Sequence, residues 1–246
     1  MFVGIIPAKL ESLRVERKNI KVLGDLPLLI YTLRAALRSP ALDRVVVSTD
    51  SELVEELALR HAEGRLEVLR RAPDLAEEGT TVEAVLLDAA DRLELGDDDG
   101  VVTLLPTSPF RTPGLIDRCV QLFRSSQADT VLTVQRAGLK LGTLDHDQAF
   151  RPSCEYPAEM HRVEPVWIDN PAVYVTRLSG LRTNRFVLGQ RCYGIEIDRI
   201  EGHDINEPLD WLVAEAILAN GLFATDANLE RPFENNGAVK VQAVID

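Results

Sequence analysis

Residues 5–19 of the chain read IIPAKLESLRVERKN. This stretch begins with two aliphatic residues, as a buried strand does, and then places four cations within ten positions: Lys9, Arg14, Arg17 and Lys18. The whole chain has 27 basic and 39 acidic residues and a formal net charge of −12. Because this local excess of positive charge runs against an acidic background, we predict that the stretch binds an anion.

Short apolar runs alternate with helical patterns along the rest of the chain. The runs do not alternate between apolar and polar residues, and each is followed by a helical pattern, which is typical of strands covered on both faces. We therefore predict an α/β fold with a doubly wound, mostly parallel sheet. The expected strands are 2–6, 44–49, 66–69, 101–105, 130–135, 172–176 and 194–197, with 237–245 as an edge strand, and the expected helices are 28–37, 51–61, 80–93, 113–125 and 208–219.

The regular pattern loosens between Arg136 and Glu164, where glycine, proline and scattered charge replace the periodic runs. We interpret residues 136–164 as a small inserted lobe or dimerisation arm, and we expect a homodimer. No internal repeat or linker separates the rest of the chain into parts. We therefore predict one domain over residues 1–246.

Composition excludes several classes of protein. A sequence pI near 4.9 argues against nucleic acid or an anionic membrane as the main partner, since both require a broad basic face. Cys119, Cys154 and Cys192 form no C-x-x-C pair, so neither a disulfide framework nor a zinc site is indicated. We see no signal peptide and no apolar run approaching 18 residues, and we predict a cytoplasmic protein.

The basic stretch lies where such a sheet binds its ligands, which is outside the carboxyl ends of the strands. Lysine and arginine side chains, together with Ser12, Asn19 and backbone N–H groups, can hold a polyphosphate there. The alternative is a solvated basic loop. The stretch lacks both G-x-x-x-x-G-K and G-x-G-x-x-G, so P-loop and dinucleotide-binding proteins are set aside.

Six motifs occur in one order along the chain: I-I-P-A-K-x-x-S-x-R-x-x-x-K-N-I, D-R-V-V-V-S-T-D, L-R-R-A-P-D-L-A-E-E, L-L-P-T-S-P-F-R-T, D-N-P-A-V-Y-V and H-D-I-N-E-P-L-D-W. With these motifs the chain resembles the bacterial acylneuraminate cytidylyltransferases, the CMP-sialic-acid synthetase type, including the pseudaminic and legionaminic acid enzymes. The resemblance implies a Rossmann-like fold of the nucleotide-diphospho-sugar transferase type. It also implies Mg²⁺ as cofactor, and CTP and an acidic keto-sugar as substrates, which give a CMP-sugar and pyrophosphate.

The resemblance assigns the nucleotide contacts by position. Lys9, Ser12, Lys18 and Asn19 match the nucleotide loop, and Arg14 is a further candidate for the triphosphate. We expect Lys9 and Lys18 to be catalytic together with the metal ligand Asp204. Lys9 stands where the family usually has arginine, so the bidentate geometry of a guanidinium is given up at this position.

Two further positions are assigned to the nucleotide. Arg71 matches the arginine that lies near the cytosine in the family, although it can equally be a surface cation beside Asp74. Thr107 and Ser108 follow a predicted strand directly, where hydroxyl groups face a ligand. Their alternative role is to cap the turn before Pro109.

The metal site is predicted at Asp204 and Asn206, which match the D-x-D of the family with one carboxylate replaced by an amide. Residues i and i+2 of an extended segment project to the same side, and Mg²⁺ accepts carboxylate and amide oxygens while it retains waters. The alternative is that both residues only cap the helix beginning near Pro208.

The sugar site is the part in which the resemblance thins. Our candidates for sugar contacts are Arg111, Asn170, Arg162 and Arg185. Leu105 stands where the sialic-acid enzymes have glutamine, so the identity of the sugar stays open. The rival interpretations are a nucleotidyltransferase of the same fold with a different NTP or sugar, and a non-catalytic nucleotide-binding relative.

Overall fold

A central sheet with the strand order β12-β11-β7-β10-β6-β1-β4-β5 organises the protein. The computed structural model describes residues 1–61, 64–77, 79–137, 141–152, 165–223 and 239–242. The strands are β1 (Phe2–Pro7), β4 (Arg44–Thr49), β5 (Leu66–Arg70), β6 (Gly100–Thr103), β7 (Thr130–Arg136), β10 (Trp167–Arg177), β11 (Arg191–Glu196) and β12 (Val239–Gln242).

Most neighbouring strands in this sheet run in the same direction. β1 pairs in parallel with β4 and β6, β4 with β5, and β11 with β7, whereas β10 runs antiparallel between β6 and β7. β12 adds an antiparallel edge beside β11, where the sequence predicts an edge strand. The predicted α/β fold with a doubly wound, mostly parallel sheet is confirmed.

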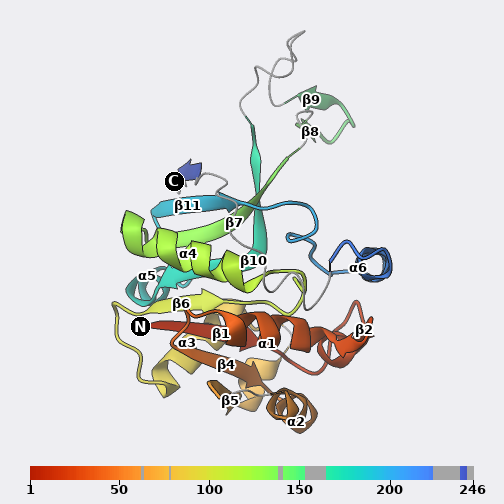
Figure 1. Cartoon of the computed structure of the whole chain (residues 1–246). Helices are drawn as coiled ribbons and strands as arrows, with labels where there is room; N and C mark the ends of the chain where they lie inside the picture. The colour runs from red at the N-terminus through yellow and green to blue at the C-terminus, as the bar shows by residue number, and fades with distance from the viewer. Residues whose placement is uncertain (62–63, 78, 138–140, 153–164, 224–238, 243–246) are drawn as a thin grey trace.

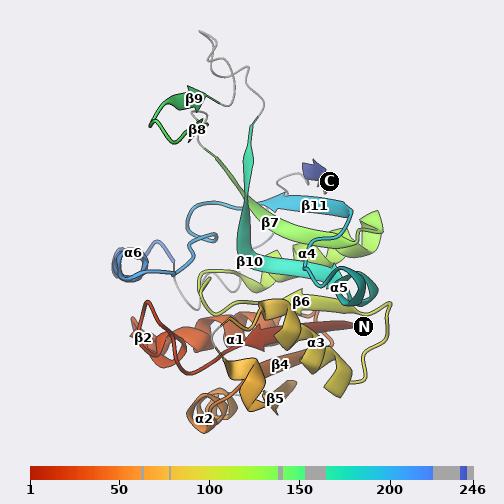
Figure 2. The ribbon, with the colours of Figure 1, turned by 180° about the vertical axis from the view of Figure 1, so that it is seen from behind.

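Helices cover both faces of the sheet (Figures 1 and 2). α1 (Leu28–Arg38), α2 (Glu52–Arg60) and α4 (Pro113–Ser126) share one apolar cluster with strand residues such as Val45 and Val47. α3 (Val82–Arg92) and α5 (Leu178–Asn184) share a second cluster with Val46 and Val101 on the other face. Because successive side chains of a strand point to opposite faces, the continuous apolar runs fill both clusters.

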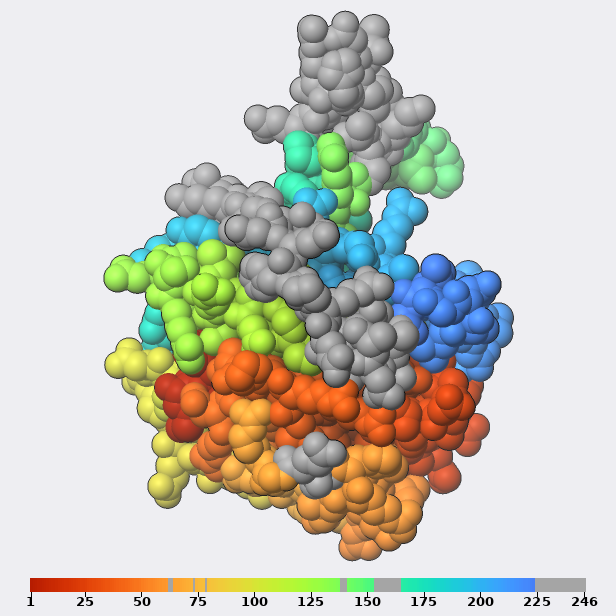
Figure 3. All heavy atoms as spheres, in the orientation of Figure 1, coloured from red at the N-terminus to blue at the C-terminus, as the bar shows by residue number. Residues whose placement is uncertain are grey.

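A third apolar cluster lies at the carboxyl ends of the strands, under α6 (Pro208–Ala219). It joins Trp211 and Ile217 of α6 to Leu23, Tyr31 and Phe110. In Figure 3, the dark blue surface of α6 lies directly beside the red-orange surface of the N-terminal region. This packing holds the C-terminal part of the chain against the segment that follows β1.

The caps of two helices follow from the local sequence. Ser51 accepts a hydrogen bond from Val54 N at 3.5 Å, and Thr112 accepts one from Leu115 N at 3.2 Å, with Pro113 as the first residue of α4. The side-chain oxygen satisfies one of the free N–H groups of each first turn, and proline has no N–H to satisfy.

Several elements differ from the sequence prediction. β10 begins at Trp167 rather than Ala172, and its register shifts between Asn170 and Tyr174 as in a β-bulge. α5 is not predicted, nor is the short hairpin of β2 (Val22–Leu23) and β3 (Leu26–Pro27). Two-residue strands and a seven-residue helix carry too little periodicity to be seen in the sequence. Short 3₁₀ helices also occur at Lys18–Ile20 and Pro73–Ala76.

The predicted inserted lobe is described only in part, because residues 138–140 and 153–164 lie outside the described residues. β8 (Gly142–Leu144) and β9 (Phe150–Pro152) pair as an antiparallel hairpin beyond the ends of β7 and β10, away from the main sheet (Figure 1). The single-domain organisation stays a prediction. In the part of the chain that the structure describes, no helix has the length and apolarity to cross a membrane.

Candidate functional site

A cavity of about 370 Å³ opens at the carboxyl ends of the parallel strands. The loops that follow β1, β5 and β6 and the N-terminal part of α3 form its walls. Ligands of doubly wound sheets bind at this edge. The lining residues are Pro7, Lys9, Ser12, Leu13, Arg14, Val15, Lys18, Asn19, Arg71, Leu75, Glu77, Thr80, Thr81, Val82, Val85, Leu105, Pro106 and Thr107.

The β1 loop, residues 8–17, forms the basic wall of this cavity. Asn19 is buried and donates from Nδ2 to the carbonyl of Lys9 at 2.7 Å, which closes the base of the loop. Leu10 N donates to Asp50 Oδ1 at 2.9 Å and ties the loop to the end of β4. The loop is thereby folded around the cavity, with the side chains of Lys9 and Arg14 on its wall.

Lys18 connects the basic wall to the C-terminal part of the chain. Its ammonium group donates to the carbonyl of Ile205 at 2.7 Å. Burial lowers the pKa of Lys18, and the nearby carboxylate of Asp204 partly opposes that shift. The contact between Lys18 and Ile205 therefore brings the β1 loop to the segment that carries Asp204 and Asn206.

Arg71 lies in the cavity wall rather than on the outer surface. Its Nε donates to Ser48 Oγ at 3.0 Å, and its Nη2 donates to the Ser48 carbonyl at 2.6 Å. Burial lowers the pKa of this guanidinium. No ion pair between Arg71 and Asp74 occurs among the described contacts. The alternative that Arg71 is a surface cation beside Asp74 therefore does not match the position of Arg71 in the cavity wall.

The part of the cavity wall formed by the loop after β5 and the start of α3 was not predicted from the sequence. The side chains there are mainly apolar or hydroxylic, and Glu77 is an acidic residue among them. The signal that could have located this wall is topological, because α3 begins after a loop at the carboxyl end of β5. A cavity with one basic and one largely apolar wall suits a ligand that has an anionic and a planar apolar part. The residues in question are Leu75, Glu77, Thr80, Thr81, Val82 and Val85.

The segment after β6 carries three predicted site residues, Thr107, Ser108 and Arg111, and only Thr107 lines the cavity. Thr107 lines the cavity, and its carbonyl accepts a hydrogen bond from Ile205 N at 2.8 Å. Ser108 and Arg111 are buried instead. Within the described part of the chain, Ser108 Oγ and Arg111 Nε and Nη1 have no hydrogen-bond partner, while Arg111 Nη2 donates to the Leu105 carbonyl. Burial lowers the pKa of Arg111 to about 9.

The β11 loop, residues 197–207, carries the predicted metal ligands between β11 and α6. Asn206 Nδ2 donates to Asp204 Oδ2, so the two side chains point toward each other. Asp204 Oδ1 is buried and has no hydrogen-bond partner among the described residues. The N-cap of α6 is Glu207, which forms a capping box with Asp210 in the first turn, and Asp210 Oδ2 accepts from Asn206 N and Glu207 N, each at 2.8 Å. Asp204 and Asn206 therefore do not serve as the side-chain cap of α6.

The candidates for sugar contacts lie apart from one another. Asn170 is buried, and its Nδ2 donates to the Gly202 carbonyl at 2.7 Å and to Gln135 Oε1 at 3.0 Å. Arg185 follows α5, which begins where β10 reaches the amino end of β6, so it lies at the edge of the sheet opposite the cavity. Arg162 lies outside the described residues. The structure does not bring Asn170 or Arg185 to the cavity.

The matches with known proteins agree with this arrangement. The cytidylyltransferase family profile matches residues 3–162, which include the β1 loop, Arg71 and Thr107. The chain belongs to the cytidylyltransferase family. This membership confirms the family-level resemblance.

The names of two relatives of the chain refer to acidic sugars. The chain is 28% identical to the CMP-N,N'-diacetyllegionaminic acid synthase of Legionella pneumophila over 88% of its own length and 95% of the relative. It is 24% identical to the N-acylneuraminate cytidylyltransferase of Streptococcus agalactiae over 85% of its own length. It spans only 51% of that second relative, so the two chains differ in extent.

A solved structure with the same fold is CMP:2-keto-3-deoxy-manno-octonic acid synthetase complexed with CTP. The superposition has a TM-score of 0.66, covers 89% of this chain and 99% of the other, and has 16% sequence identity. At this identity the likeness supports the fold of this cytidylyltransferase and leaves its ligand contacts to be argued from its own residues.

Proposed function

We propose that this protein transfers the cytidylyl group of CTP to an acidic keto-sugar of the sialic or nonulosonic acid type, with release of pyrophosphate. The observation that carries the proposal is the 2.7 Å contact from Lys18 Nζ to the Ile205 carbonyl. It joins a basic cavity wall to the loop with Asp204 and Asn206. The reaction needs such a pairing, because a triphosphate must be neutralised where its α-phosphorus is attacked.

The chemistry requires positioning more than covalent participation. The anomeric hydroxyl of the sugar attacks the α-phosphorus and loses its proton to solvent, the bond from the α-phosphorus to the oxygen that bridges it to the β-phosphorus breaks, and pyrophosphate leaves with that oxygen. Lys9, Arg14 and Lys18 are proposed to hold the triphosphate, with Ser12 and Asn19 shaping the loop. Arg71 and the apolar wall around Val82 are proposed to receive the cytosine.

Mg²⁺ is the proposed cofactor, and the residues present fit it. Asp204 Oδ1 is a buried carboxylate oxygen with no hydrogen-bond partner in the described chain, and the Asn206 amide lies beside the same carboxylate. Among the described residues, no group of three His, Cys, Asp or Glu side chains could hold a metal. Mg²⁺ does not need such a group, since it is commonly bound by one or two carboxylates plus substrate phosphates and water. Bound there, it would neutralise charge on the phosphate oxygens.

The proposal is tested by pyrophosphate release with CTP, Mg²⁺ and a panel of sialic, legionaminic and pseudaminic acids. Turnover with at least one of these acids is expected. A thermal-shift series with CTP, GTP, UTP and ATP runs beside it, because a ligand at 100 times its Kd stabilises a fold by about 2.7 kcal/mol. No turnover with any of the acids, together with turnover of another nucleotide or sugar, would overturn the proposal.

A homodimer in the cytoplasm is the proposed working form. The described part of the arm exposes Leu144 at 64% and Phe150 at 52%, and neighbouring β10 exposes Ile168 at 55%. Exposed apolar side chains on one projecting element favour contact with another protein surface. Light scattering of the wild type and of Leu144→Glu with Phe150→Glu tests this: a dimer for the first and a monomer for the second are expected, and a monomeric wild type would contradict it.

A further inference from the structure

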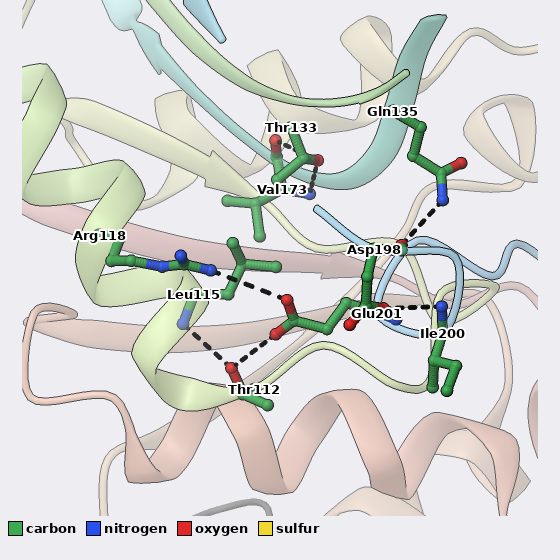
Figure 4. A network of polar contacts seen from close by, with 9 residues as sticks. All are labelled: Thr112, Leu115, Arg118, Thr133, Gln135, Val173, Asp198, Ile200 and Glu201. Atoms are coloured by element: carbon green, nitrogen blue, oxygen red, sulfur yellow. Dashed lines mark hydrogen bonds and ion pairs between the residues drawn. The ribbon is translucent and has the colours of Figure 1, made fainter. Parts of the chain in front are cut away.

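The β11 loop is fastened to the sheet by residues far away in the sequence (Figure 4). Asp198 Oδ1 accepts from Ile200 N and Glu201 N, each at 2.8 Å, which fixes the first turn of the loop. Gln135 Nε2 donates to the Asp198 carbonyl at 2.9 Å from the end of β7. The loop therefore leaves β11 in one defined direction.

The bulge in β10 supplies a second attachment to the sheet. The Thr133 hydroxyl on β7 accepts from Val173 N at 3.0 Å and donates to the Asn170 carbonyl at 2.7 Å. It therefore bonds two backbone groups of β10 at the place where the pairing of β10 with β7 shifts. The bulged segment presents the Asn170 amide to the Gly202 carbonyl at 2.7 Å. β-bulges commonly redirect a side chain in this way near functional sites.

Glu201 attaches the opposite side of the loop to helix α4. Its Oε1 accepts from Thr112 Oγ1 at 3.0 Å, and its Oε2 lies 3.7 Å from Arg118 Nη2 (Figure 4). The Thr112 hydroxyl also accepts from Leu115 N as the cap of α4, so its single proton is available for Glu201. The side chains of Glu201 and Arg118 are only 21% and 15% exposed, so this ion pair is shielded from bulk water.

Glu201 and Ile205 attach the loop to one continuous segment. Ile205 N donates to the Thr107 carbonyl, and Glu201 accepts from Thr112, both of which belong to the segment between β6 and α4. Asp204 lies between the two attachment points. We propose that Glu201 is a positioning residue, which fixes the Asp204 carboxylate near Lys18 through its contacts with Thr112 and Arg118. This inference rests on the proposed function, because it takes Asp204 as the metal ligand.

A residue that orients a metal ligand affects metal affinity more than folding. Loss of such partners typically costs about 10–100-fold in metal affinity or activity. A purely structural ion pair would change the melting temperature and leave the Mg²⁺ requirement unchanged. The two roles are therefore separated by the Mg²⁺ concentration that gives half-maximal activity.

The test uses Glu201→Gln, which keeps a hydrogen-bond acceptor but removes the charge, and Glu201→Asp, which keeps the charge on a shorter side chain. For Glu201→Gln we expect the half-maximal Mg²⁺ concentration to rise about tenfold, with partial recovery in Glu201→Asp. Thermal shift with CTP and increasing Mg²⁺, in the absence of sugar, should show the same displacement without turnover. Arg118→Gln removes the opposite charge and is expected to displace the Mg²⁺ midpoint in the same direction, which keeps the test decisive if a Glu201 variant does not fold.

The matched control is Glu67→Gln, since Glu67 pairs with Arg44 at 2.7 Å on the far strands β5 and β4. It should leave the Mg²⁺ midpoint unchanged. Wild-type Mg²⁺ midpoints in folded Glu201→Gln and Arg118→Gln, beside an inactive Asp204→Ala, would overturn this inference alone. An active Asp204→Ala would instead overturn the metal site in the proposed function.

Discussion

The β1 loop and the β11 loop meet at Lys18, yet they are built in opposite ways. Within residues 8–17, the side chains of Leu13, Arg14 and Arg17 are exposed. Two backbone N–H groups hold this loop near the end of β4: Ala8 N donates to the Ser48 carbonyl, and Leu10 N donates to Asp50 Oδ1. The β11 loop is instead fastened through Asp198, Glu201, Gly202 and Ile205 to three different elements. One loop can adapt its side chains, whereas the other is held in place.

This difference matches what each loop is proposed to hold. A triphosphate has several rotatable bonds, so flexible cations can follow it at little cost in geometry. A metal ligand must keep its oxygen within a narrow range of positions. We therefore expect substitutions in the β11 loop to reduce the rate strongly, and substitutions of exposed cations in the β1 loop to weaken binding mildly.

The largest effect is expected for Asp204→Ala and Asp204→Asn. Both remove the carboxylate charge near Lys18, and we expect kcat to fall by about 10²–10³-fold, as for loss of a strong electrostatic contact in an active site. Steady-state kinetics with saturating Mg²⁺ measures this, and chelation of Mg²⁺ should abolish wild-type turnover. Asp98→Asn, in an exposed turn, is the control that should keep full activity. Near-normal turnover of Asp204→Asn would contradict the proposal that the β11 loop holds a carboxylate that the reaction needs.

The second effect is expected at Lys18, which directly follows the β1 loop and contacts the β11 loop through Ile205. Lys18→Ala should lower kcat/KM for CTP by about 10–100-fold, because a charge-assisted hydrogen bond is worth about 1.5–3 kcal/mol. Burial lowers the pKa of Lys18 below its ordinary value of 10.5, so the charged form is lost at a lower pH than for an exposed lysine. Activity should therefore decline as the pH rises toward that value.

Lys18→Arg provides the matched comparison for this pH effect. Arginine stays charged at alkaline pH, so the decline should move to higher pH even if the maximal rate is reduced. The pH profile of kcat/KM between neutral and alkaline pH is the measurement. Identical alkaline declines in the wild type and Lys18→Arg would show that another group titrates.

A third, intermediate effect is expected for Gly202→Ala. A Cβ there would lie 2.3 Å from Gln135 Nε2 and 2.9 Å from Asn170 Nδ2, so the attachments of the β11 loop to the sheet must shift. We expect about a tenfold rise in the half-maximal Mg²⁺ concentration and a lower melting temperature. Gly180→Ala is the control, because nothing lies within 4 Å of its Cβ position. Unchanged Mg²⁺ dependence of Gly202→Ala would mean that the loop need not be held there.

The same contrast explains which features could be predicted from the sequence. The strand of residues 44–49 and the helix of residues 113–125 depend on neighbours in the chain, and both were predicted. The basic β1 loop was visible because its charge departs from the acidic average. The direction of β10 could not be predicted, because a strand has the same local pattern whether it runs parallel or antiparallel.

The fastening of the β11 loop was missed for a related reason. Thr112 and Glu201 are 89 residues apart, and each has an ordinary local interpretation as a helix cap or a surface acid. Asn170 was interpreted as a sugar contact, but its amide is used by Gly202 and Gln135, which no local pattern reveals. The apolar cavity wall around Val82 has the same sequence pattern as any buried helix face.

The smallest effect is expected for Arg14, which lines the cavity although its side chain is 64% exposed. Its nearest described acid is Glu207, at 4.0 Å, so the guanidinium is weakly held and screened by solvent. Arg14→Ala should raise KM for CTP about two- to fivefold at low salt, and the difference should shrink as salt increases. Arg17→Ala is the internal control, because Arg17 pairs with Glu11 at 3.6 Å and is not among the lining residues that the structure describes. Equal effects of the two substitutions would mean that the β1 loop acts through its overall charge, and a much larger effect of Arg14→Ala would mean that this loop, too, holds its cations in fixed positions.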